Sequence, residues 1–200
     1  PEQKPDRRAF LEVGEAEALI QAIDPYWRPL VMFLADTGCR WGEAVGLTID
    51  KVDIERGIVV ISAALAEVRG RFSLKTPKSG RSRVVLLPAR TTVALQTYLD
   101  EFGTGQFSDA VSGQVVTGLV FHGRLGAPPQ RSQFRRRVWN PAVAKAGEMP
   151  QIDLGDMSAI KMQGVFGNAD PVGDGRDQPQ PRRTRDIDVA LHECPFRLDE

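Results

Sequence analysis

The chain has 200 residues, 42% of them hydrophobic, and its 26 Lys and Arg balance 26 Asp and Glu, an ordinary composition for one large domain or one domain with a tail. The two cysteines are too few for a disulfide framework and favour a cytoplasmic protein. The longest apolar run, about Leu30 to Ala35, is too short for a membrane-spanning helix. Residues 1–147 hold 20 basic against 15 acidic residues and residues 148–200 hold 6 against 11, so the basic excess that suits a polyanion lies in the first part.

The first part of the chain predicts a linker followed by three helices. Residues 1–9 are polar and contain two prolines, which is typical of a linker. Apolar side chains then recur at helical spacing. The predicted helices cover Glu12 to Ile23, Pro29 to Asp36 with Gly38 as its stop, and Trp41 to Leu47.

The pattern changes to β-branched runs in the middle of the chain. Three such runs, separated by turns rich in Gly, Pro and Ser, predict a small three-stranded antiparallel sheet over residues 57–62, 71–75 and 81–88. Further on, the sequence predicts a helix over 91–102, a loop over 103–118, a short extended piece at GLVF and a helix over 132–146. The predicted fold class is therefore α+β, mainly α, with a single core.

Beyond Gly147 neither a period of two nor one of 3.6 is sustained, and Gly, Pro and Asp are frequent. Such a segment buries too little apolar surface to fix its backbone. The sequence therefore predicts one domain over residues 10–147 and a divergent, poorly structured tail over residues 148–200.

Cofactor and metal signatures are missing from the sequence. It has no phosphate-binding glycine loop, no dinucleotide fingerprint and no metal-ligand spacing, so neither a cofactor nor a metal is expected. The two histidines lie far apart, and His122 in VFHG is interpreted as a strand-end or turn residue.

Basic residues near predicted turns and helix starts are the remaining candidates. Arg40 stands in an otherwise apolar stretch, where a guanidinium needs a planar anionic partner, either a carboxylate of the protein or a bound group. Arginine forks match phosphate oxygens, and a flexible lysine can reach a phosphodiester. The candidate phosphate-contacting residues are Arg40, Lys75, Arg81, Arg83, Arg135, Arg136 and Arg137. For the run at 135–137, the alternative that these are only solvated surface charges stays open.

Two segments resemble the catalytic domain of the tyrosine recombinase, or phage integrase, family. LADTGCRWGEAVGL is similar to the family's first sequence box, T-G-x-R-x-x-E-x-x-x-L, although Ile49 stands where the family usually has an aromatic residue. LKTPKSGRSRVVLLP resembles the family's lysine-bearing hairpin. The resemblance covers about residues 6–147 and has both segments in the family's order.

The resemblance implies a chemistry for these residues. In the family, two arginines hold the scissile phosphate of double-stranded DNA, a lysine protonates the leaving 5′ oxygen, and a tyrosine forms a 3′-phosphotyrosine bond without metal or nucleotide. Arg40 would be the first of these arginines, Glu43 a buried partner that supports the site, and Lys75 the general acid. Residues 1–9 would be the linker from a missing N-terminal DNA-binding domain, and other recombinase protomers would be partners.

The expected second box, H-x-L-R-H, and a downstream tyrosine are not found after AVAKAG, and Tyr26 and Tyr98 both lie upstream. These groups act as a unit, so the sequence predicts no nucleophile and a truncated or frameshifted, inactive prophage remnant of a recombinase. The alternative is a non-catalytic DNA-binding module that occupies attachment sites. A third possibility is a protein–protein role for the tail, which no specific feature supports.

Overall fold

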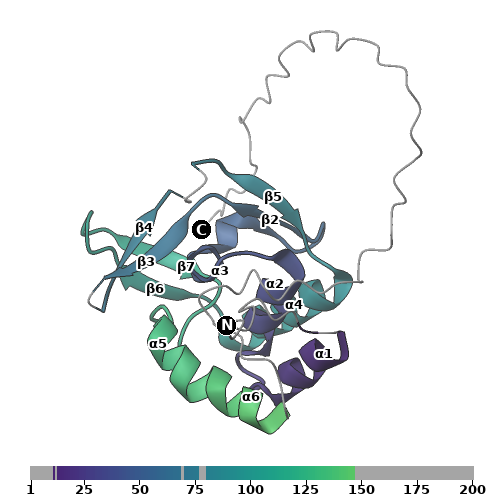
Figure 1. Ribbon diagram of the computed structural model, residues 1–200. Coiled ribbons are helices and arrows are strands. Elements are labelled where there is room, and N and C mark those ends of the chain that lie inside the picture. The colour runs from purple at the N-terminus through teal and green to yellow at the C-terminus, as the bar shows by residue number, and fades with distance from the viewer. Residues whose placement is uncertain (1–10, 12, 69, 77–79, 147–200) are drawn as a thin grey trace, which may run out of the picture. The chain divides into compact units, whose positions relative to one another are not determined.

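The computed structural model describes residues 11, 13–68, 70–76 and 80–146 (Figure 1). The predicted linker and the predicted tail both lie outside the described residues. The helices are α1 (Val13–Ala22), α2 (Arg28–Thr37), α3 (Trp41–Val45), α4 (Ala89–Phe102), α5 (Arg131–Phe134) and α6 (Asn140–Ala146). A 3₁₀ turn, η1 (Ile49–Lys51), follows α3, and a π-helical segment, η2 (Arg135–Trp139), joins α5 to α6.

The predicted helices are confirmed within a few residues. Pro29 lies in the first turn of α2, where its missing N–H costs nothing. The helix stops at Gly38, which has φ +61° and whose amide donates to the Leu34 carbonyl at 3.0 Å. Arg40 then takes an extended conformation before α3, so α2 and α3 are two separate helices.

Three antiparallel sheets make up the β-structure of the described residues. The three-stranded sheet has the order β1 (Val52–Asp53), β2 (Ile58–Ile61) and β5 (Arg83–Leu86). Strands β3 (Ala64–Val68) and β4 (Arg71–Lys75) form one hairpin, and β6 (Gly105–Ser108) and β7 (Val115–Leu119) form another.

The small antiparallel sheet is present, but its third strand was predicted wrongly, and so was the loop over 103–118. Its third strand is β1, because residues 71–75 pair with the unpredicted strand β3 across a turn in which Gly70 has φ +74°. The alanine-rich sequence of β3 carries a weak strand signal. The predicted loop over 103–118 contains the hairpin β6–β7, whose short Gly- and Ser-containing strands are likewise weak in pattern.

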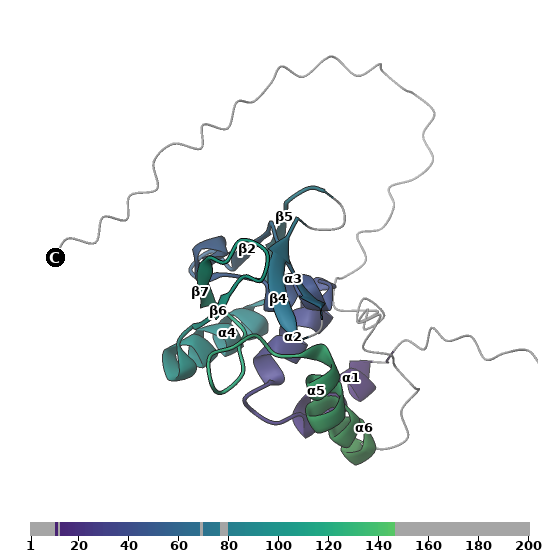
Figure 2. The same cartoon turned by 90° about the vertical axis from the view of Figure 1, so that its left-hand side faces the viewer.

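Figures 1 and 2 both show most of the helices on one side of the described domain and the strands on the other. Helix α2 packs against α4, and α1 packs against α6. The apolar faces of these helices meet the inward faces of the strands in one hydrophobic core. Its most completely buried large side chains are Trp139, Phe33, Phe121, Leu19, Ile23, Leu30, Leu34, Ile61, Leu95 and Leu119.

Two glycines allow α3 to lie directly on β3. A Cβ atom at Gly42 would lie 2.6 Å from the Leu65 carbonyl oxygen, and one at Gly46 would lie 2.8 Å from the Leu65 amide nitrogen. The neighbour of Leu65 in β3, Ala64, is paired with Lys75 of β4. The fold therefore packs the helix that follows Arg40 against the hairpin that ends in Lys75.

Candidate nucleic-acid interface

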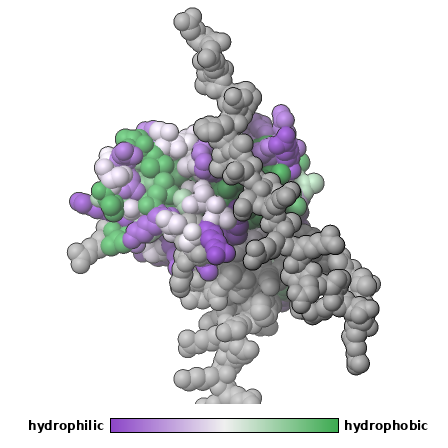
Figure 3. All heavy atoms as spheres, turned by 90° about the horizontal axis from the view of Figure 1, so that it is seen from above, coloured by the Kyte–Doolittle hydropathy of each residue, from purple (hydrophilic) through white to green (hydrophobic). Residues whose placement is uncertain are grey.

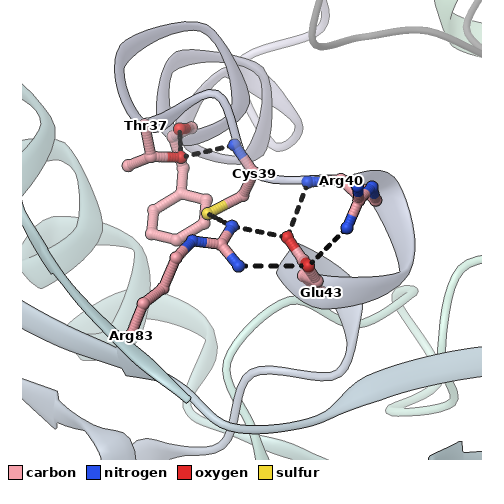
Figure 4. A network of polar contacts seen from close by, with 6 residues as sticks. Thr37, Cys39, Arg40, Glu43 and Arg83 are labelled. Atoms are coloured by element: carbon pink, nitrogen blue, oxygen red, sulfur yellow. Dashed lines mark hydrogen bonds and ion pairs between the residues drawn. The ribbon is translucent and has the colours of Figure 1, made fainter. Parts of the chain in front are cut away.

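The turn between α2 and α3 is held by its own polar groups. The Thr37 hydroxyl donates to the Phe33 carbonyl at 2.5 Å, and the Cys39 amide donates back to the Thr37 hydroxyl oxygen at 3.2 Å (Figure 4). The Arg40 amide donates to Oε2 of Glu43 at 3.0 Å, which caps the first turn of α3. Arg40 is therefore fixed at the start of that helix.

Glu43 is the buried charge of this stretch, with a side chain only 1% exposed. Arg83 reaches it from β5 as a fork, with Nη2 at 2.6 Å from Oε2 and Nη1 at 3.1 Å from Oε1. Burial acts to raise the pKa of Glu43, but the hydrogen bonds from Arg83 and from the Arg40 amide outweigh it and lower the pKa. The carboxylate is thus ionised and already paired with an arginine of its own chain.

The Arg40 side chain points away from the core. It is 60% exposed, and its guanidinium approaches Glu43 only loosely, with Nη1 at 3.4 Å from Oε1 (Figure 4). Arg40 stands in an apolar stretch of the sequence, but the expectation that its side chain lies among apolar neighbours is wrong, because that side chain leaves the start of α3 toward solvent. Glu43 is supported mainly by Arg83, which was predicted to contact DNA.

Lys75 lies at the exposed end of β4, beside a groove of about 480 Å³. On the side where β3 and β4 lie, Figure 3 shows hydrophobic surface bordered by hydrophilic side chains. The groove therefore combines an apolar wall with two basic residues. Its lining residues are Ala66, Val68, Arg71, Ser73, Lys75, Ala110 and Val111.

Asp109 fixes β4 from the adjacent hairpin. Its carboxylate accepts the Leu74 amide at 2.7 Å as well as the amides of Val111 and Ser112, and these backbone hydrogen bonds lower its pKa. The Ala110 amide also donates to the Phe72 carbonyl at 2.8 Å. Asp109 was not singled out from the sequence; its only signal was the turn composition of SDAVSG.

The arginine run at 135–137 lies on η2, where all three side chains are exposed. Phe134, just before the run, is buried and its ring centroid lies 4.8 Å from that of Trp41, the first residue of α3. Aromatic packing therefore links this basic run to the helix that follows Arg40. Arg81 lies in the exposed segment before β5. That Arg40 and Lys75 act at one phosphate, as the resemblance implies, stays a prediction.

Both tyrosines of the sequence are buried against one carbonyl. The Tyr26 hydroxyl donates to the His122 carbonyl at 2.8 Å, and the Tyr98 hydroxyl lies 3.2 Å from that of Tyr26. Burial raises the pKa of each phenol. Tyr26 lies in the turn between α1 and α2 rather than on a helix. His122 is itself buried, with its Nδ1 at 2.8 Å from the Gly123 carbonyl oxygen, in line with its interpretation as a turn residue.

In the described part of the chain, no three His, Cys, Asp or Glu side chains gather closely enough to hold a metal ion. None of its helices is both long and apolar enough to cross a membrane.

The sequence shows the family to which the chain belongs. Residues 9–154 match the phage integrase family, and the chain belongs to that family as a tyrosine recombinase catalytic domain. No curated protein matches the chain.

Solved recombinases share its fold. The Tn1549 transposon integrase in complex with circular intermediate DNA is 18% identical with a TM-score of 0.65, covering 78% of this chain and 52% of that one. The XerA recombinase is 23% identical with a TM-score of 0.56, covering 79% and 49%. The XerH recombinase bound to its difH substrate is 19% identical with a TM-score of 0.51, covering 76% and 41%. The chain thus spans about half the length of the first two and less of the third.

Proposed function

We propose that this chain acts in site-specific DNA recombination by binding the phosphates of duplex DNA, and that it does not cleave DNA by itself. Family membership and fold support site-specific recombination as the process. The finer claims are that Arg40 contacts a phosphate, that Lys75 lies near the same strand, and that the covalent step has no nucleophile in this chain.

The observation that carries the proposal is the pairing of Glu43 with Arg83. A buried carboxylate that already receives a forked guanidinium has little capacity left for a second one. The neighbouring Arg40 guanidinium is left exposed on a turn whose backbone is fixed. The three charges together leave one net positive charge, carried by the group that faces solvent, which is suited to an external anion.

The surroundings of Arg40 support a polyanion rather than a small ligand. The β3–β4 hairpin contributes Arg71 and Lys75 beside a groove, and η2 contributes an exposed run of arginines. Both elements are linked by packing to α3. Several basic groups around one helix fit a backbone with repeated phosphates. The solved Tn1549 integrase and XerH structures are complexes with DNA.

The buried tyrosines support the absence of cleavage by this chain. A phenol that attacks phosphate must be exposed and lose its proton, whereas Tyr26 and Tyr98 donate into the core and burial raises their pKa. Exposed Arg40 and Lys75 can stabilise and protonate only a reaction that another group begins. Partner recombinase protomers, a prophage origin and a cytoplasmic location are further parts of this proposal.

Salt-dependent binding to a labelled duplex tests the proposal. The wild-type chain should bind weakly and with little sequence preference, and its affinity should fall steeply from low to physiological salt. Arg40→Ala should lower the affinity modestly and reduce the salt slope by about one, as expected for the loss of one phosphate contact. Arg56→Ala is the matched control, because Arg56 is an exposed arginine paired with Asp53. Salt-independent binding, no binding, or equal effects of both variants would overturn the proposal.

A further inference from the structure

A second buried carboxylate–arginine pair lies on the other side of the Arg40 turn. Asp36, at the end of α2, has a side chain only 2% exposed. It accepts from Arg90 in the first turn of α4, with Nε at 3.0 Å from Oδ2 and Nη2 at 2.5 Å from Oδ1. The Thr91 hydroxyl donates to the same carboxylate.

The two pairs connect the same two segments. Asp36 and Glu43 lie at the two ends of the turn that carries Arg40, while Arg83 and Arg90 lie at the two ends of the segment that leads from β5 into α4. Asp36, at the first end of the turn, pairs with Arg90, at the far end of the other segment. Glu43 pairs with Arg83, and both pairs are forked. The turn is thus attached at both ends to one adjoining segment.

Two separate forked pairs restrain the position and direction of the turn as well as stabilising the fold. A single pair would leave the turn free to pivot about that point, whereas two separated forks fix both its position and its direction. Between the two attachment points, the exposed guanidinium of Arg40 is the only arginine side chain of the turn. Sequence reasoning alone does not select Arg90, because a predicted helix start readily accepts an arginine.

We infer that Arg90, through Asp36, is a positioning residue that works together with the Arg83–Glu43 pair to hold Arg40 in the orientation in which it meets a DNA phosphate. The effect of Arg90 on DNA binding rests on the proposed function, whereas its effect on the order of the turn does not. Arg90 does not contact the DNA; it orders the turn that does, so the backbone that carries Arg40 is already ordered before binding.

Two variants and one control separate positioning from a general loss of stability. Arg90→Ala removes the fork, and Arg90→Lys keeps the charge but lacks the planar pair of nitrogens that forms it. Glu17→Gln is the matched control, because Glu17 accepts from the same arginine at 3.2 Å on an exposed side and leaves Asp36 unchanged. All are made in the full 200-residue chain.

Amide hydrogen exchange gives the readout that does not depend on DNA. In Arg90→Ala, the amides of Cys39 and Arg40 should exchange at least about tenfold faster, while those of α6 change little. Arg90→Lys should show a smaller acceleration at the same amides, and Glu17→Gln none. Unchanged exchange at these two amides, or an equal acceleration throughout the domain, would overturn the inference.

Duplex binding at low salt gives the second readout, as a double-mutant cycle. Arg40→Ala should weaken binding about fivefold in the wild-type and Glu17→Gln backgrounds, but less than about twofold when Arg90 is alanine. A full fivefold effect in the Arg90→Ala background would overturn the inference. If the wild-type chain bound no DNA, the proposed function would fail, while the exchange experiment would still decide whether Arg90 orders the turn.

Discussion

Arg83 and Glu43 lie 40 positions apart in the sequence, yet Nη2 of the arginine is 2.6 Å from Oε2 of the glutamate. The carboxylate is buried and the guanidinium is partly exposed. This relationship ties the three-stranded sheet to the start of α3 and leaves Arg40 facing solvent.

Removal of Arg83 should destabilise the fold. Arg83→Ala leaves the Glu43 carboxylate buried without its forked partner, and the partial exposure of the site lets water replace some of the lost hydrogen bonds. We expect a decrease of about 2 kcal/mol in the free energy of unfolding in urea, below the 3–5 kcal/mol typical of fully buried pairs. The double variant Arg83→Met/Glu43→Gln should recover part of that loss; a double variant less stable than Arg83→Ala would contradict this explanation.

The Glu43 carboxylate should make stability depend on acid pH. Its pKa in the folded protein is lowered from the ordinary value of 4.5, so its stabilising contribution is present above that value and is lost as the pH falls through the lower folded value. The free energy of unfolding of the wild-type chain should therefore decline more steeply below pH 4.5 than that of Glu43→Gln. Parallel pH profiles for the two proteins, measured by urea unfolding, would show that Glu43 is not responsible.

The contact between α3 and β3 should not tolerate a methyl group. Gly42→Ala would place a Cβ atom 2.6 Å from the Leu65 carbonyl oxygen. The resulting displacement should cost about 1–3 kcal/mol in thermal or urea unfolding. Gly14→Ala in α1 is the matched control, because nothing lies within 4 Å of its added Cβ. That variant should be neutral or more stable by up to about 1 kcal/mol; equal losses for the two variants would refute the close contact.

Asp109 should govern the order of the strand that carries Lys75. Asp109→Ala removes the acceptor of the Leu74 amide and of two amides in its own loop. The Leu74 amide should then exchange faster with solvent, and more so than amides of β2. Asp53→Ala is a suitable comparison, since Asp53 accepts the Arg56 amide in an exposed turn at 2.9 Å without reaching another strand. Unchanged exchange at Leu74 in Asp109→Ala would remove Asp109 from this role.

Local signals explain why much of the fold could be predicted. Helical periodicity with Pro29 and Gly38 at the ends of α2, and β-branched runs in β2 and β5, are properties of short segments. The hairpins β3–β4 and β6–β7 were not predicted, because strands that contain alanine and glycine pair through contacts with neighbours that a single sequence does not identify. The third strand of the sheet was misassigned for the same reason.

The candidate site shows the same division. The motif identified Arg40 and Glu43 and implied that Glu43 is buried, but not that its partner is Arg83 or that Arg40 is exposed. Both outcomes depend on the meeting of segments about 40 residues apart, which sequence spacing does not encode. Arg90 and Asp109 had no chemical signature at all, because their roles come from position alone.

The central claim is that this chain holds duplex DNA through phosphate contacts and does not cut it. The most direct measurement is to incubate the full chain with a labelled, nicked duplex at low salt and divide each sample between a native gel and a denaturing gel. The native gel should show a retarded complex that disappears when salt is raised to physiological levels, and the denaturing gel should show free DNA only. A covalent adduct on the denaturing gel, above all one lost in Tyr98→Phe, or no retarded complex at low salt, would contradict the claim.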